Sequence, residues 1–102
     1  MKIAVVDDSK FTRMVIKQIL NDFSNADFCW EAENGKVALE KNTQYPVDLI
    51  ISDLEMPVLD GLQLLKKVIA VEPKTKCLLI SAFHKSNQPK IIDALKAGAI
   101  GF

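Results

Sequence analysis

The sequence lacks any apolar stretch long enough to cross a membrane. Its longest apolar runs have about five residues, whereas a membrane-spanning helix needs about 20. Two aspartates follow the first short apolar stretch, where a secretory signal peptide would need a longer apolar core and then small residues. We therefore expect a cytoplasmic protein with no membrane partner.

An excess of charge of either sign is also lacking. Lys and Arg together number 13, as do Asp and Glu, so the formal net charge is zero. This balance gives no general attraction to nucleic acid, and we expect no direct nucleic-acid partner. The 102 residues, of which 49% are hydrophobic, suffice for one domain with its own core.

Cysteine and histidine are scarce. Cys29 and Cys77 lie in apolar stretches without metal-ligand spacing, so we expect buried, reduced thiols. The one histidine, His84, lies in a predicted loop, where a surface role is expected. No glycine-rich turn follows the first apolar run, which disfavours a dinucleotide-binding site.

Short apolar runs alternate with helical patterns along the sequence. Continuous apolar runs are typical of strands buried on both faces of a parallel sheet. Such runs occupy residues 3–6, 47–51 and 77–80, and a weaker, alternating run at 28–32 suits an edge strand. Trp30 and the phenylalanines are expected mostly in the core.

Each predicted helix has a plausible start signal. Ser9, Asn34 and Asp60 precede the first three helical patterns as candidate N-caps. Pro89 predicts the start of a fourth helix and Gly98 its end. The order βαβαβαβα predicts an α/β fold, a doubly wound parallel sheet covered by helices on both faces, within a single domain spanning residues 1–102.

Acidic residues follow two of the predicted strands. Asp7 and Asp8 come directly after the first strand, and Asp53 and Glu55 follow the third. Because the carboxyl ends of parallel strands meet at one edge, neighbouring first and third strands would bring three carboxylates together. At 4 Å and an effective dielectric near 20, each pair would cost about 4 kcal/mol.

Bound protons or a divalent cation would relieve this repulsion. Oxygen ligands beside water suit Mg²⁺, and the lack of Cys and His disfavours zinc. Helix capping explains a single Asp at a strand end equally well, but it explains three acids on two strands poorly. Ser81 follows the fourth strand, where its hydroxyl either donates to a phosphoryl oxygen or bonds to nearby backbone.

Six short motifs are specific in combination. They are Asp7-Asp8-Ser9 with Arg13, residues 32–35, residues 48–53, Met56-Pro57 with Asp60-Gly61, Ser81-Ala82, and residues 97–99. Together they resemble the receiver domain of two-component response regulators, chemotaxis receivers in particular, over almost the whole chain. The resemblance implies a flavodoxin-like fold with strand order 2-1-3-4-5.

The resemblance also implies a role for each acidic residue. Asp53 would be the phosphoacceptor, taking a phosphoryl group from a sensor histidine kinase or a phosphotransfer protein. Asp8 and Asp53 would bind Mg²⁺ directly, together with the backbone carbonyl of Glu55. Asp7 would act mainly through a bound water.

Two further residues would report phosphorylation in such a domain. Ser81 would bond the phosphoryl group and shift on activation, and Phe102 would be the switch aromatic that turns inward with it. The domain would then signal by conformational change and would not be an enzyme beyond its own phosphorylation and dephosphorylation.

The chain departs from the family pattern at its C-terminal end. The family's fifth strand ends in a Lys-Pro pair before a fifth helix, and Phe102 lies about three residues before that Lys would come. We therefore expect an incomplete receiver with strand order 2-1-3-4-(5). Without that lysine, one positive charge that would stabilise the phosphoryl oxygens is missing, so phosphorylation would be slower. A sheet left uncovered would favour self-association or strand exchange.

Two alternatives remain open. A degenerate or truncated receiver would act as a phosphorylation-independent protein-interaction module. A dehalogenase-like phosphatase would place its nucleophile after the first strand with a second Asp two residues on, but Ser9 stands at that position.

Overall fold

The computed structural model describes residues 1–80. Several predictions concern residues beyond this range and lie outside the described residues: the roles of Ser81 and Phe102, the surface position of His84, and the helix from Pro89 to Gly98.

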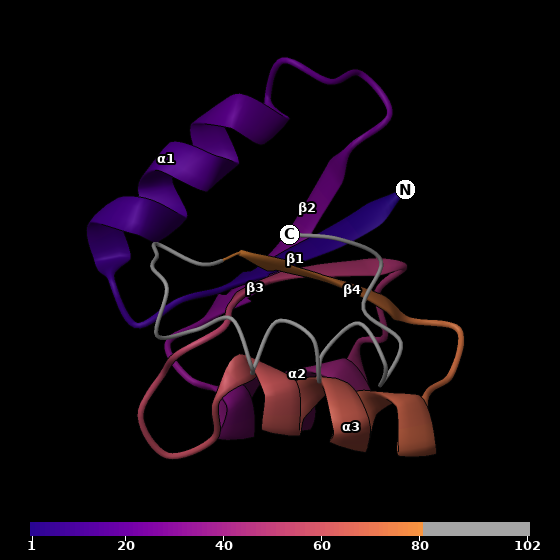
Figure 1. The fold of residues 1–102 in the computed structure, drawn as a ribbon. Helices are drawn as coiled ribbons and strands as arrows, with labels where there is room; N and C mark the ends of the chain where they lie inside the picture. Colours follow the sequence, from indigo (N-terminus) through magenta and orange to yellow (C-terminus); the bar gives the residue numbers. More distant parts are fainter. Residues whose placement is uncertain (81–102) are drawn as a thin grey trace.

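One parallel sheet forms the centre of the described residues (Figure 1). Its strands are β1 (Lys2–Val6), β2 (Asp27–Ala32), β3 (Leu49–Asp53) and β4 (Lys76–Ile80). They lie in the order β2-β1-β3-β4, and every neighbouring pair is parallel. The predicted doubly wound sheet and the strand order 2-1-3-4 are therefore confirmed.

Helices cover both faces of this sheet. They are α1 (Lys10–Leu20), α2 (Gly35–Gln44) and α3 (Gly61–Val71). Figure 1 shows α1 on one face and α2 and α3 side by side on the other. No helix within residues 1–80 is long and apolar enough to span a membrane.

The three predicted N-caps are confirmed. The side chains of Ser9, Asn34 and Asp60 each accept a backbone N–H from the first turn of their helix, at 3.2, 2.9 and 2.9 Å. At α3 the Gln63 side chain also accepts the backbone N–H of Asp60, which completes a capping box. These caps fix where each helix begins, next to the carboxyl ends of the strands.

The core lies between the sheet and the helices α2 and α3. Residues 3–6 of β1 are all buried, as expected for a strand covered on both faces. The largest fully buried side chains in the described residues belong mainly to β1, β3, α3 and β4: Ile50, Leu54, Leu64, Leu65, Leu79, Val5, Val6, Val68, Thr75, Cys77 and Ser52.

The opposite face is covered less completely. Within the described residues no side chain of α1 is buried, and Phe11 is 73% exposed. Phe23 and Phe28 are exposed as well, so the prediction that the phenylalanines lie mostly in the core is wrong for these three. Among the elements of residues 1–80, α1 is the one helix on this face.

The two cysteines differ. Cys77 is buried as predicted, whereas Cys29 is exposed, which contradicts the prediction. The register between β1 and β2 shifts after Ile3: Ile3 pairs with Phe28 and Ala4 with Trp30. Cys29 is therefore the extra residue of a bulge on an outer strand and has no partner across the ladder.

The third strand begins later than predicted. Residues 47–51 were the expected strand, but β3 runs from Leu49 to Asp53. The N–H of Val47 donates to the Asn42 side chain at 3.0 Å, and its carbonyl accepts from the Thr75 hydroxyl at 2.7 Å. At Val47, side chains therefore take the bonds that a sheet ladder would otherwise make. The strand ends at Asp53.

Candidate metal centre

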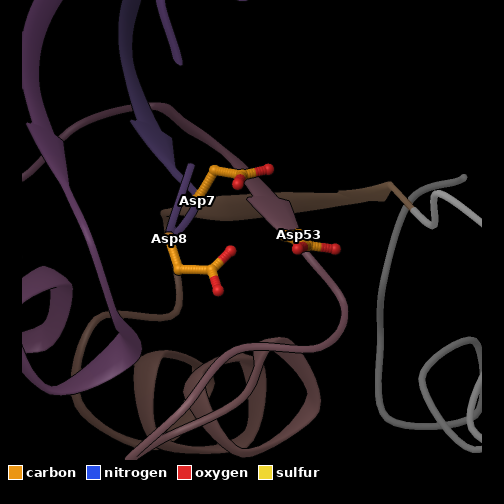
Figure 2. Close-up of side chains that lie close together, drawn as sticks. All are labelled: Asp7, Asp8 and Asp53. Atoms are coloured by element: carbon orange, nitrogen blue, oxygen red, sulfur yellow. The ribbon is translucent and has the colours of Figure 1, made fainter. Parts of the chain in front are cut away.

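Three carboxylates meet at the carboxyl edge of the sheet. Asp7 and Asp8 follow β1, and Asp53 ends β3, its neighbour, in a register that pairs Val6 with Ser52. One carboxylate oxygen from each Asp lies within 4.8 Å of the others (Figure 2). The predicted convergence of these acids is therefore confirmed.

The three acids differ in exposure. Asp7 is buried at 5% exposure, Asp53 is partly buried, and Asp8 is exposed to solvent. The cluster thus has a protein-facing side and a water-facing side. An open hollow of about 360 Å³ lies beside it, lined by Asp8, Glu55, Met56, Pro57 and Asp60.

This arrangement makes it costly to ionise Asp53. Burial raises the pKa of Asp53 to about 6, and the charges of Asp7 and Asp8 contribute, while the backbone N–H of Glu55 acts in the opposite sense. Burial also raises the pKa of Asp7, against the lowering effect of the Ser9 N–H. A bound cation would remove this cost by favouring the ionised carboxylates.

The donor set fits Mg²⁺. Three carboxylates, each offering one oxygen, with one exposed member, match an ion that binds a few carboxylates and keeps several waters. Asp7, Asp8 and Asp53 would hold it. The predicted contribution of the Glu55 carbonyl stays a prediction; the structure shows instead that the Glu55 N–H lies 3.4 Å from Asp53 Oδ1.

The loop after β3 depends on a close backbone approach. The N–H of Gly61 donates to the Leu54 carbonyl at 2.9 Å, and a Cβ at this position would collide with the Asp53 carbonyl. Position 61 therefore accommodates only glycine without displacing the backbone at Asp53. In the same loop Val58 has a φ of 71°, in the left-handed region that a β-branched residue rarely adopts.

A second glycine at this edge, Gly35, also makes a close backbone approach. The N–H of Gly35 donates to the Leu59 carbonyl at 3.0 Å, and a Cβ on Gly35 would collide with that same oxygen. Gly35 therefore lets the start of α2 touch the loop after β3. The signal that could have identified it was its place directly after a helix N-cap.

Arg13 is a residue to which sequence reasoning gave no function. Its Nη1 donates to the Asp7 carbonyl at 2.6 Å, and its Nε donates to Glu31 at 2.7 Å. The available signal was its position in the second turn of the helix that follows the two aspartates. Its side chain is only 13% exposed, which is low for an arginine.

Comparison with known proteins identifies the family. The family model described as the response regulator receiver domain matches residues 3–102. The chain belongs to this family. The parallel sheet and the acidic cluster are thus those of a receiver domain.

Two curated relatives illustrate the range of proteins that contain similar domains. A protein-glutamate methylesterase/protein-glutamine glutaminase from Pseudoalteromonas translucida is 41% identical over 99% of this chain. The chain spans only 26% of that protein's length. The chemotaxis protein CheY from Bacillus subtilis is 39% identical, and the match covers 99% of this chain and 82% of CheY.

A solved structure gives the same fold. The CheX-CheY-BeF3-Mg complex from Borrelia burgdorferi has a chain with a TM-score of 0.87 and 28% identity to this receiver domain. The match covers 98% of this chain and 74% of that one. The flavodoxin-like fold expected from the sequence is therefore confirmed.

Proposed function

We propose that this receiver domain accepts a phosphoryl group on Asp53 in a Mg²⁺-dependent reaction. Asp7, Asp8 and Asp53 would hold the ion, joined by the backbone carbonyl of Glu55. The observation that carries the proposal is the meeting of three carboxylates from two neighbouring strands within 4.8 Å. The magnesium and beryllofluoride in the name of the Borrelia CheY complex support the same chemistry here.

In phosphoryl transfer the protein contributes mainly by positioning the reacting groups and stabilising their charge. An Asp53 oxygen forms a bond to phosphorus as the phosphorus–nitrogen bond of the donor phosphohistidine breaks, and the imidazole leaves. Asp53 ends a strand bonded on both sides, which holds it in place for in-line attack. Bound Mg²⁺ supplies positive charge that offsets the phosphoryl oxygens.

The donor would be a sensor histidine kinase or a phosphotransfer protein. Ser81 would bond the phosphoryl group and Phe102 would respond to it, so that phosphorylation changes the surface offered to partners. Activity of the domain itself would be limited to its own phosphorylation and dephosphorylation.

Uptake from a small phosphodonor such as acetyl phosphate tests this proposal without the cognate kinase. Intact-mass measurement should show one added phosphoryl group in the wild type with Mg²⁺ and none in Asp53→Asn. Asp22→Asn is the matched control, because Asp22 is an exposed acid distant from the cluster in the sequence. Equal uptake by Asp53→Asn would refute Asp53 as the acceptor.

We also propose that the domain self-associates through the apolar stripe on α1. This stripe comprises Phe11, Met14, Val15 and Ile19, which are 73%, 45%, 37% and 52% exposed. Exposed apolar surface of this kind favours a partner. A second copy is suitable because it carries the same stripe, and the net charge of zero gives no overall repulsion between copies.

Sedimentation at increasing concentration tests self-association. The wild type should become heavier with concentration, and Phe11→Glu should remain a monomer. Lys36→Gln makes the same change in net charge at an exposed position of α2 and should behave like the wild type. A monomeric wild type at all concentrations would contradict both stripe pairing and strand exchange.

A phosphorylation-independent interaction module is the second candidate, and the exposed α1 stripe is the observation that favours it. If the folded wild type takes up no phosphoryl group yet self-associates through the stripe, this candidate replaces the first.

A further inference from the structure

Arg13 joins the acidic cluster to two other elements. Its Nη1 donates to the Asp7 carbonyl at 2.6 Å, and its Nε donates to Glu31 Oε1 at 2.7 Å. Arg13 belongs to α1, Asp7 directly follows β1, and Glu31 belongs to β2. One planar guanidinium therefore ties three elements together beside the candidate metal centre.

The N–H, the carboxylate and the carbonyl of Asp7 each have an identified partner. Its N–H donates to the Ala32 carbonyl at 3.1 Å, and its carboxylate Oδ1 accepts the Ser9 N–H at 2.8 Å. Arg13 supplies the donor to the remaining group, the carbonyl. Each bond comes from a different neighbour. The carbonyl belongs to the peptide unit that joins Asp7 to Asp8, so the Arg13 bond acts on the orientation of both residues.

We propose that Arg13 is a positioning residue of the metal centre, holding the Asp7 backbone so that the Asp7 and Asp8 carboxylates face Asp53. This inference rests on the proposed Mg²⁺ site and adds a residue that contacts no metal. Partners that orient metal ligands commonly change metal affinity when they are removed.

The geometry requires arginine in particular. A guanidinium presents several N–H donors in a rigid, planar arrangement, so one side chain bonds a carbonyl and a carboxylate in fixed directions. The ammonium of a lysine lacks this arrangement. Glu31 provides the anchor, because its carboxylate fixes Nε and thereby aims Nη1 at Asp7.

Lys17 offers a matched control. Its Nζ pairs with Glu31 Oε2 at 2.6 Å, on the same helix and the same carboxylate as Arg13. Lys17→Gln and Arg13→Gln thus each remove one charge and one ion pair between α1 and β2. In addition, Arg13→Gln removes the bond to the Asp7 carbonyl.

The test is the Mg²⁺ affinity of the unphosphorylated full chain by titration calorimetry, with urea unfolding to measure stability in parallel. Arg13→Gln should bind Mg²⁺ on the order of tenfold more weakly than the wild type. Lys17→Gln should keep the wild-type affinity even if both variants lose similar stability. Equal losses of affinity in the two variants would show a general effect of loosening α1 and would overturn the proposal.

Arg13→Lys separates geometry from charge. It keeps the positive charge but not the planar donor arrangement, so it should bind Mg²⁺ nearly as weakly as Arg13→Gln. Wild-type affinity in Arg13→Lys would show that charge alone suffices, which would overturn the positioning role.

The controls also distinguish this inference from the proposed function. Wild-type Mg²⁺ binding with unchanged affinity in Arg13→Gln would refute only the role of Arg13. Failure of the folded wild type to bind Mg²⁺ would refute the metal centre and the role of Arg13 together.

Discussion

Asp53 lies where ionisation opposes folding in the absence of metal. Its pKa rises from 3.8 to about 6 in the folded chain, so the folded state holds the proton more tightly than the unfolded state. The metal-free protein should therefore lose stability as the pH rises through this window. Above it the loss should be about 1–2 kcal/mol, allowing for solvent screening.

The substitution Asp53→Asn removes the free-energy cost of ionising Asp53 in the folded protein. Urea unfolding without Mg²⁺ near pH 7 should show Asp53→Asn more stable than the wild type, with the difference disappearing near pH 4. Saturating Mg²⁺ should reverse the order, because only the wild type gains from binding the ion. A less stable Asp53→Asn at neutral pH without metal would contradict the electrostatic account of the site.

Glu31 affects the pH dependence of stability in the opposite direction to Asp53. Hydrogen bonds from Lys17 and then Arg13 lower the pKa of Glu31 below 4.5. Its contribution to stability is therefore present above pH 4.5 and is lost as the pH falls through the lowered pKa. Glu31→Gln should cost about 1 kcal/mol at neutral pH, and this deficit should narrow in acid. A deficit independent of pH in urea unfolding would show that packing, not charge, is lost.

At the scale of elements, the loop between β3 and α3 has backbone strain beside the site. The φ of 71° at Val58 costs a β-branched residue roughly 1–2 kcal/mol. Val58→Asn should raise the free energy of unfolding by about 1 kcal/mol, because Asn tolerates this conformation. Val71→Asn, at an exposed position in α3, is a control that should not stabilise. An unchanged or lower stability in Val58→Asn would contradict the strain.

The start of α3 is coupled to Asp53 through Gly61. A Cβ at this position would collide with the Asp53 carbonyl, so Gly61→Ala should displace either the helix or Asp53. We expect a loss of about 2 kcal/mol in stability and weaker Mg²⁺ binding by calorimetry. Unchanged values for both would show that the loop adapts without moving Asp53.

Helix starts were predictable because their signals are local. Ser9, Asn34 and Asp60 each act within three residues of their own position, so sequence alone reveals them. The start of β3 was not predictable in this way, because Asn42 and Thr75 reach Val47 from elsewhere in the fold. The exposure of Cys29 was missed for a similar reason, since a bulge depends on the register of two strands.

At the scale of the whole molecule, the site arises from topology. Asp7 and Asp53 are far apart in sequence, and they meet because β1 and β3 are neighbours in a parallel sheet. The alternation of strands and helices predicted such a sheet, but the strand order came from the family resemblance. The Arg13 bond to the Asp7 carbonyl could not be predicted, because it depends on how α1 lies against the sheet.

The most direct test of the central claim is Mg²⁺-dependent binding of beryllofluoride, followed by fluorine NMR. This phosphoryl mimic needs Asp53 and the metal centre together and requires no kinase. The wild type should show a bound signal with Mg²⁺ that vanishes when the metal is chelated, and Asp53→Asn should show none. A bound signal without Mg²⁺, or in Asp53→Asn, would contradict a phosphoacceptor site built from Asp7, Asp8 and Asp53.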